Sequence, residues 1–191
     1  MSIGKRNITT KRIEMLYKAG LTIFHASDAA NLWQLTDPHL LHITLERFKK
    51  YELIYRIYRG LYSLDDPEKL DPILLGYKAI HDYCYLSTES VLFKNGYISR
   101  KIDPVTFISS KSKKFRIREN LYYSRQMDDK FLFNTAGIEM INGVPTASAE
   151  RAATDILYYN PLFHFDREPD WKIVQKLQEE IGYPLTKNRY K

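Results

Sequence analysis

Residues 53–64, LIYRIYRGLYSL, predict a β-hairpin that sets the architecture of the N-terminal third of this 191-residue chain. Two short runs of aromatic and β-branched residues flank Arg59-Gly60, which is typical of two strands and a turn. Directly before the hairpin, residues 37–50 (DPHLLHITLERFKK) predict a helix, with Asp37 as its cap and Pro38 at its first position. A helix followed by a basic, aromatic hairpin is the order of elements in a winged helix-turn-helix. Such a module usually binds nucleic acid.

The segments upstream of this helix fit the same interpretation. Residues 8–19 have apolar side chains at roughly helical spacing, including Tyr17, and Gly20 ends the pattern. Residues 21–24 are a short apolar run that can add a strand to the hairpin, and Ser27 is expected to cap a helix through Leu35. Because residues 65–72 are rich in Asp and Pro, we expect a winged helix-turn-helix domain over 1–66 and a second domain over 67–191.

The second domain is predicted to be mixed α+β, with a small β-sheet flanked by helices. Strands are expected at 83–86, 105–108, 115–118 and 131–133, and Asn142-Gly143 predicts a hairpin within 138–146. Helices are expected at 72–81, after Ser87 to about Lys94, at 149–159 after Ser148, and at 171–181 after Asp170. The chain as a whole is therefore expected to be α+β.

The positive charge of the chain is concentrated in two places. The net charge is +6, and residues 1–64 hold 10 Lys/Arg against 5 Asp/Glu, whereas residues 65–191 hold 19 against 18. A second surplus lies within 94–125, where 9 basic residues face 2 acidic ones. Net charge alone is weak evidence for a nucleic-acid partner, but its distribution agrees with a basic N-terminal module.

The helix over 38–50 is predicted to turn Leu41, Leu45 and Phe48 towards the core, which leaves its polar side for a ligand. Such side chains read base edges or hold phosphates in DNA complexes. The candidate DNA-binding residues, on this helix, on the hairpin and on the first helix, are Lys11, Arg12, His39, His42, Thr44, Arg47, Lys50, Arg56 and Arg59. The alternative for any one of them is an ordinary solvated face.

A second basic surface is expected on the strand around Phe115. Alternation along the strand turns Lys114, Arg116 and Arg118 one way and buries Phe115 and Ile117. The candidate residues of this surface are Lys113, Lys114, Arg116 and Arg118, and the alternative is again a solvated sheet face.

The sequence favours neither an enzyme nor a metalloprotein. Glu139, Glu150 and Asp155 are the carboxylates that a nuclease-like activity would use to hold Mg²⁺, but no phosphate loop or catalytic motif accompanies them. A module that only binds protein, without specific DNA binding, is a third possibility. His39 and His42 share a helix face without further ligands, so no metal and no cofactor is expected. Cys84, the one cysteine, is predicted to be a buried core thiol.

The chain is also expected to be cytoplasmic. No apolar run approaches the roughly 20 residues that span a bilayer, and the polar N-terminus has no signal-peptide pattern.

Three segments, taken together, resemble AbiEi-type antitoxins of type IV toxin–antitoxin systems. They are RGLYSL (59–64), YLSTESVL (85–92) before Asn95-Gly96, and ASAERAATDIL (147–157), of which the ERA-x-x-D pattern is the most specific. The resemblance implies a DNA-binding antitoxin and transcriptional autorepressor of an abortive-infection operon, active in phage defence. It also implies that the winged helix binds inverted repeats in its own promoter, with a possible dimer on the DNA. The second domain would counter a nucleotidyltransferase-like toxin without a stable complex.

Glu150, Arg151 and Asp155 carry this family pattern, and they also have a physical interpretation. Arg151 and Asp155 are spaced i, i+4, so a surface ion pair is available, and Glu150 near the helix start complements the helix dipole. A structural role that ties the helix to the sheet is favoured over catalysis.

Overall fold

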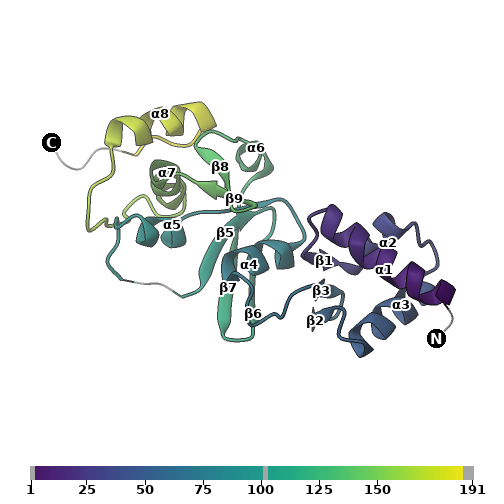
Figure 1. Cartoon of the computed structure of the whole chain (residues 1–191). Coiled ribbons are helices and arrows are strands. Elements are labelled where there is room, and N and C mark those ends of the chain that lie inside the picture. Colours follow the sequence, from purple (N-terminus) through teal and green to yellow (C-terminus); the bar gives the residue numbers. More distant parts are fainter. Residues whose placement is uncertain (1–2, 101–102, 187–191) are drawn as a thin grey trace. The chain divides into compact units, whose positions relative to one another are not determined.

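The computed structural model describes residues 3–100 and 103–186, which divide into two compact units (Figure 1). Unit 1 is Met1–Asp71 and unit 2 is Pro72–Lys191. Each unit contains helices and a sheet of its own, so the chain is α+β. The division falls at Asp71, a little after residue 66 where the sequence placed it.

Unit 1 is a three-helix unit with a small antiparallel sheet. Its elements in chain order are α1 (Ile3–Lys18), β1 (Ile23–His25), α2 (Ala26–Trp33), α3 (Pro38–Lys50), β2 (Tyr55–Tyr58) and β3 (Leu61–Ser63). The strand order is β1-β3-β2, so the short run before α2 pairs with the hairpin as the sequence predicted. Gly60 forms the turn with φ +91°, a conformation that glycine adopts without strain.

The start of α3 follows the predicted chemistry, whereas the start of α2 does not. Asp37 Oδ1 accepts a hydrogen bond from the His39 backbone N–H at 2.9 Å. Ser27 lies inside α2 and does not cap it; the cap is His25, whose backbone N–H donates to Asp28 Oδ2 at 2.8 Å. The prediction for Ser27 was wrong because the reciprocal bond from an acidic residue three positions into the helix fixes the start two residues earlier.

The core of unit 1 forms where the helices meet the sheet. The fully buried apolar side chains include Leu16, Phe24, Leu45 and Phe48. Leu45 and Phe48 were expected to face inward, and they do. Tyr17, taken for part of the apolar face of α1, is instead 56% exposed.

Unit 2 is built on a six-stranded mixed sheet. The strands are β4 (Cys84–Leu86), β5 (Val105–Ser109), β6 (Lys113–Ile117), β7 (Asn120–Gln126), β8 (Ile138–Ile141) and β9 (Val144–Ala147). Their order is β6-β7-β5-β4-β9-β8, with parallel pairing for β5–β7 and β4–β9 and antiparallel pairing elsewhere. The hairpin predicted at Asn142-Gly143 is β8–β9.

Two predictions in the middle of the chain were wrong. Residues 131–133 were expected to be a strand, but Asp128 caps the short helix α6 (Asp129–Leu132) by accepting from the Lys130 backbone N–H at 3.2 Å. The sequence also missed β7, the central partner of β5 and β6, whose NLYYSRQ mixes polar and aromatic residues. An apolar run of three residues does not distinguish a strand from a helical turn.

Helices cover both faces of this sheet. They are α4 (Pro72–Ile80), α5 (Glu89–Lys94) and α7 (Ala149–Tyr159), and α8 (Trp171–Ile181) packs on α7. Gly76 of α4 lies against the ring of Tyr122, where an added Cβ would come within 2.3 Å, so α4 covers the face that carries Tyr122 and Phe107. Ser90 of α5 bonds to Thr106, the neighbour of Phe107, and therefore lies on the opposite face.

Ser87 was predicted to cap the helix after β4, but the cap residue of α5 is Thr88. The Ser87 hydroxyl instead donates to Asp155 Oδ2 at 2.7 Å. Among the described residues, no helix is both long and apolar enough to cross a membrane.

Candidate nucleic-acid interface

The outer side of α3 is open and polar. His39, His42 and Lys50 are exposed, and Ile43 between them is 47% exposed. Thr44 was predicted to be a DNA-binding residue on this side, which is wrong, because its side chain is only 2% exposed. The spacing explains the error: Thr44 precedes the buried Leu45 and lies at the edge of the inward face.

The β2–β3 hairpin continues the same surface. Arg56 Nη1 of β2 lies 3.8 Å from Glu46 Oε1 of α3, and Glu46 Oε2 also pairs with Lys49 Nζ at 2.5 Å. The hydrogen bond and charge of Lys49 hold the pKa of Glu46 below its ordinary value. Arg59 is exposed at the turn, next to Tyr58.

Two arginines connect this surface to α1. Arg12 Nη1 donates to Thr44 Oγ1 at 3.4 Å, and its guanidinium lies 5.6 Å from the Trp33 ring centroid. Burial lowers the pKa of Arg12, and the nearby positive charge of Arg47 lowers it further. Among the described residues, the buried Nε of Arg47 has no hydrogen-bond partner. The two guanidinium groups therefore repel each other within unit 1.

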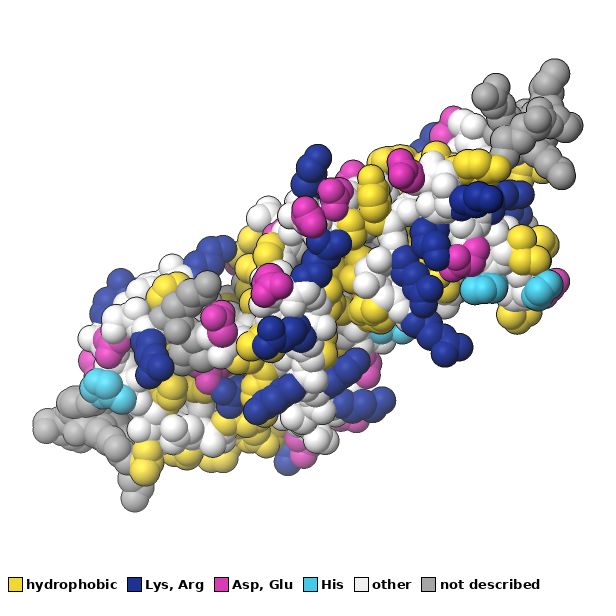
Figure 2. Space-filling model, turned by 90° about the horizontal axis from the view of Figure 1, so that it is seen from below, with side chains coloured by type: hydrophobic (Ala, Val, Ile, Leu, Met, Phe, Trp, Pro, Cys, Tyr) yellow, Lys and Arg dark blue, Asp and Glu magenta, His cyan; other side chains and the backbone are white. Residues whose placement is uncertain are grey.

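The predicted residues of unit 1 therefore fall into three groups. Lys11, His39, His42, Lys50, Arg56 and Arg59 are exposed, Arg12 and Arg47 are half-buried, and Thr44 is buried. Figure 2 shows dark-blue Lys and Arg side chains beside cyan histidines on the part of unit 1 that carries α3 and the hairpin.

The second basic surface has a different composition from the one predicted. Lys113, Lys114 and Arg116 are exposed on β6, but Arg118 lies beyond the strand, in the turn before β7, with φ +53°. The expectation that Arg118 shares a strand face with Lys114 and Arg116 was wrong because the chain reverses there.

The family-pattern helix α7 carries a buried ionic network. Arg151 Nε donates to Asp155 Oδ1 at 2.9 Å, and both side chains are 0% exposed, so the expected surface ion pair is in fact fully buried. Arg151 Nη2 donates to the Tyr85 hydroxyl of β4 at 2.9 Å, and Nη1 donates to the carbonyls of Asn134 (3.0 Å) and Ala136 (2.7 Å). The helix is thus tied to the sheet, as the structural interpretation predicted.

Asp155 is surrounded by donors. Besides Arg151, the hydroxyls of Ser87 (2.7 Å) and Tyr183 (3.0 Å) donate to its carboxylate. Burial raises the pKa of Asp155, while these three partners oppose the shift by stabilising the ionised form. Glu150, half-buried at the helix start, accepts from the Tyr97 hydroxyl at 3.1 Å. With their hydrogen bonds used inside the protein, Arg151 and Asp155 serve structure rather than chemistry on a ligand.

Sequence reasoning missed a second ion pair in unit 2. Arg125 of β7 bonds to Glu89 of α5, and its guanidinium lies 5.3 Å and 5.5 Å from the ring centroids of Tyr123 and Tyr159. No local signal predicts this pair, because Glu89 and Arg125 are 36 residues apart and meet only through the sheet.

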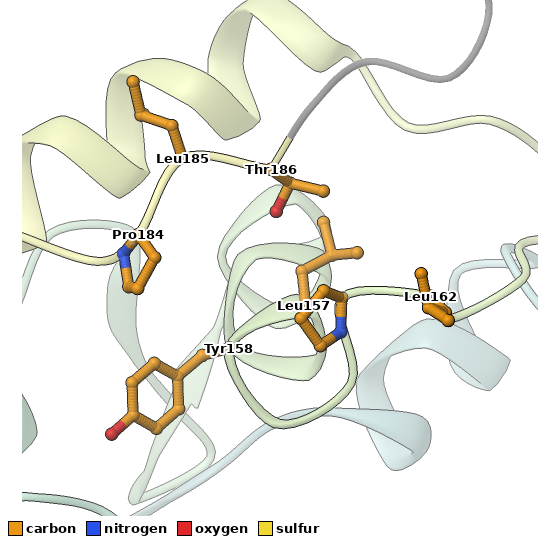
Figure 3. A pocket seen from close by; sticks show the side chains of 7 residues that line it. Leu157, Tyr158, Leu162, Pro184, Leu185 and Thr186 are labelled. Carbon is orange, nitrogen blue, oxygen red and sulfur yellow. The ribbon is translucent and has the colours of Figure 1, made fainter.

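Unit 2 also contains a cavity and a buried cysteine. An apolar cavity of about 470 Å³ lies between the end of α7 and the segment after α8, lined by side chains such as Leu157, Leu162, Pro184 and Leu185 (Figure 3). The side-chain hydroxyls in its lining are those of Tyr158 and Thr186, both labelled in Figure 3. Cys84 is fully buried as predicted, and burial raises its pKa to about 12. Within residues 3–100 and 103–186, no cluster of three or more His, Cys, Asp or Glu side chains is arranged to hold a metal ion.

Comparison with known proteins gives a fold and no family. No protein-family model matches the chain, and no curated protein matches it. The fold is similar to that of the RV2827C protein from Mycobacterium tuberculosis, known from a crystal structure, with a TM-score of 0.51 and 12% sequence identity. The match covers 93% of this chain and 72% of the other. At this identity the similarity concerns the fold alone.

Proposed function

We propose that unit 1 is a winged helix-turn-helix that binds double-stranded DNA, and that the chain is a transcriptional regulator. The order α1-β1-α2-α3-β2-β3 and the sheet order β1-β3-β2 support this assignment. In this module the second helix of the helix-turn-helix pair enters the major groove, and here that helix is α3. The hairpin β2–β3 is then the wing.

The observation that carries the proposal is the set of exposed basic side chains on α3, the wing and α1. His39 and His42 lie towards the N-terminal part of α3, where base edges are read. Arg59 on the wing and Lys11 on α1 flank the helix, in positions suited to phosphate contacts.

We further propose that the regulator is an AbiEi-type antitoxin that represses its own operon in the cytoplasm. The resemblance in 59–64, 85–92 and 147–157 supports this assignment. On this proposal unit 1 binds inverted repeats in the promoter, with two protomers on the DNA. Unit 2 counters a nucleotidyltransferase-like toxin, without a stable complex between the two proteins.

The DNA-binding proposal is tested with duplexes from the region upstream of the chain's own gene. We expect the full chain to bind this DNA more tightly than a random duplex of equal length, with affinity that falls steeply as salt is added. Fluorescence anisotropy over a salt series measures both quantities. Equal affinity for the two duplexes would exclude specific autoregulation.

The antitoxin proposal is tested separately, by co-expression with the product of the neighbouring gene. We expect a nucleotidyltransferase-like reading frame beside this one, and we expect growth to be rescued when both proteins are made. Rescue by a variant that no longer binds the promoter would assign the antitoxic activity to unit 2. Failure of the full chain to rescue growth would reject the antitoxin role and leave the DNA-binding proposal intact.

A further inference from the structure

Strands β6 and β7 form one end of the sheet of unit 2, and one face of this pair is hollowed into a groove of about 380 Å³. Pro104, Leu121 and Tyr123 contribute apolar and aromatic surface to the groove, and Lys114 and Arg116 supply its positive charges. Phe115 and Tyr122, whose side chains point to the other face, also border it. None of these residues belongs to the surface proposed for duplex DNA in unit 1.

The strand register places these side chains on a single face. Lys114 pairs with Tyr123, and Arg116 pairs with Leu121. Directly opposed residues of an antiparallel pair point to the same side of the sheet. Accordingly, Lys114 Nζ lies 4.9 Å from the ring centroid of Tyr123, while Leu121 is 37% exposed beside them.

The other face of the same strands is occupied. Phe115 and Tyr122 stack there with ring centroids 5.0 Å apart, α4 packs against Tyr122 at Gly76, and Lys113 Nζ lies 5.2 Å from the Phe115 ring centroid. Lys113 and Lys114 are therefore exposed neighbours that lie on opposite faces of one strand.

The electrostatics of the groove favour a polyanion. Residues 111–126 contain six Lys/Arg and one acidic residue, Glu119. Further along the groove face, Arg125 is paired with Glu89 and adds no net charge. Lys114 and Arg116 remain as the cations beside Leu121 and Tyr123. Figure 2 shows dark-blue side chains gathered over the part of unit 2 formed by β6 and β7.

We propose that this groove binds single-stranded nucleic acid. Bases pack on Tyr123 and Leu121, while Lys114 and Arg116 contact the phosphates, the combination that non-specific single-strand binding requires. In a duplex the base faces are stacked on one another, so they cannot pack on Leu121 and Tyr123. An acidic peptide matches the charge, but only a single strand presents an unstacked base beside every phosphate.

The test uses the full chain and labelled oligouridylate and oligothymidylate of about 12 nucleotides. Fluorescence anisotropy gives the affinity of the wild type and of each variant. We expect the double variant Lys114→Ala, Arg116→Ala to bind at least about tenfold more weakly. We expect Tyr123→Ala to lose about fivefold or more and Tyr123→Phe to bind like the wild type, because stacking needs the ring and not the hydroxyl.

Lys113→Ala is the matched control, because it removes the same charge from the adjacent residue on the opposite face. If the groove is the binding site, Lys114→Ala should lose clearly more affinity for the oligonucleotides than Lys113→Ala. The affinity for the promoter duplex should be unchanged in both variants. Equal losses, or a double variant with wild-type affinity, would overturn the proposal and leave only general electrostatic attraction. Polyglutamate that competes as well as unlabelled oligouridylate would overturn it too, and would indicate an acidic protein partner.

Discussion

Charged residues differ sharply in exposure between α3 and its hairpin in unit 1 and helix α7 in unit 2. In unit 1, Arg59 and Lys50 are exposed. In unit 2, Arg151 and Asp155 are 0% exposed. Arg151 also donates to the Tyr85 hydroxyl and to the carbonyls of Asn134 and Ala136. The hydroxyls of Ser87 and Tyr183 donate to Asp155. An exposed charge stays available to a ligand, whereas a buried and satisfied charge is committed to the fold.

The difference explains why residue type alone did not identify the site. Both groups stand out in the sequence as charged side chains within recognisable local elements. Only the surroundings, supplied by distant segments, decide which group faces solvent. The exposed group is therefore expected to govern binding, and the buried group is expected to govern stability.

The largest expected effect comes from breaking the buried pair. We expect Arg151→Ala to lower the free energy of unfolding of unit 2 by about 3–5 kcal/mol, because it leaves the Asp155 carboxylate buried without its charge partner. Chemical denaturation followed by circular dichroism measures the loss. Lys130→Ala is the control, since Lys130 pairs with Asp128 at 3.4 Å but is 63% exposed, and we expect a loss below about 1 kcal/mol. Similar losses for the two variants would refute the contrast between buried and exposed charge.

The sequence predicted local features well where the cause is local. Asp37, Pro38 and Gly60 gave the start of α3 and the turn of the hairpin because capping and positive φ depend on a few adjacent residues. The i, i+4 spacing likewise predicted that Arg151 and Asp155 pair. The burial of this ion pair was not predictable from local spacing, because the residues packed around it include Tyr85, which is 66 residues away from Arg151.

The predicted surface of unit 1 shows the same limit. Helical periodicity assigned Leu45 and Phe48 to the core correctly, but it misplaced Thr44 at the boundary between the two faces. Whether a boundary position is covered depends on α1, whose Arg12 lies 32 residues before Thr44. For the same reason the missed pair Glu89–Arg125 needed the sheet to be known first.

The next effect concerns the exposed group. We expect Arg47→Ala and Arg59→Ala each to weaken binding to the promoter duplex by roughly 5- to 150-fold, which corresponds to about 1–3 kcal/mol. The slope of the logarithm of the binding constant against the logarithm of the salt concentration should become shallower by about 1 for each lost phosphate contact. Thermal unfolding is expected to change little for Arg59→Ala, because its side chain is exposed. Unchanged DNA affinity in both variants would remove the support for a binding surface on α3 and the wing.

A third prediction uses Cys84, which reports on unit 2 alone because the chain has one cysteine. Burial raises the thiol pKa from its ordinary value of 9.0 to about 12, so the folded state favours the neutral thiol. The free energy of unfolding therefore does not depend on this thiol below pH 9. As the pH rises from 9 towards 12, ionisation of Cys84 in the unfolded state lowers the free energy of unfolding by at most about 1.4 kcal/mol per pH unit.

We therefore expect a thiol reagent to modify Cys84 slowly in the native wild type near neutral pH and fast in urea. Arg151→Ala should speed the native reaction, because its unit 2 opens more often, while Arg59→Ala should leave the rate unchanged. Rapid modification of the native wild type would show that Cys84 is not sealed in the core of unit 2.

The smallest expected effect separates two adjacent residues of α3. Thr44 is buried and Ile43 is 47% exposed, so Thr44→Val is expected to lower the stability of unit 1 by about 1 kcal/mol through the lost bond from Arg12, with DNA affinity within about twofold of the wild type. Ile43→Asp is expected to do the reverse, because it places a negative charge on the face that meets phosphates while leaving the core intact. Anisotropy and thermal unfolding of the two variants give both quantities. A Thr44→Val variant that keeps wild-type stability but no longer distinguishes the promoter from random DNA would mean that α3 contacts DNA through its buried side. Thr44 would then be a binding residue and not a structural one.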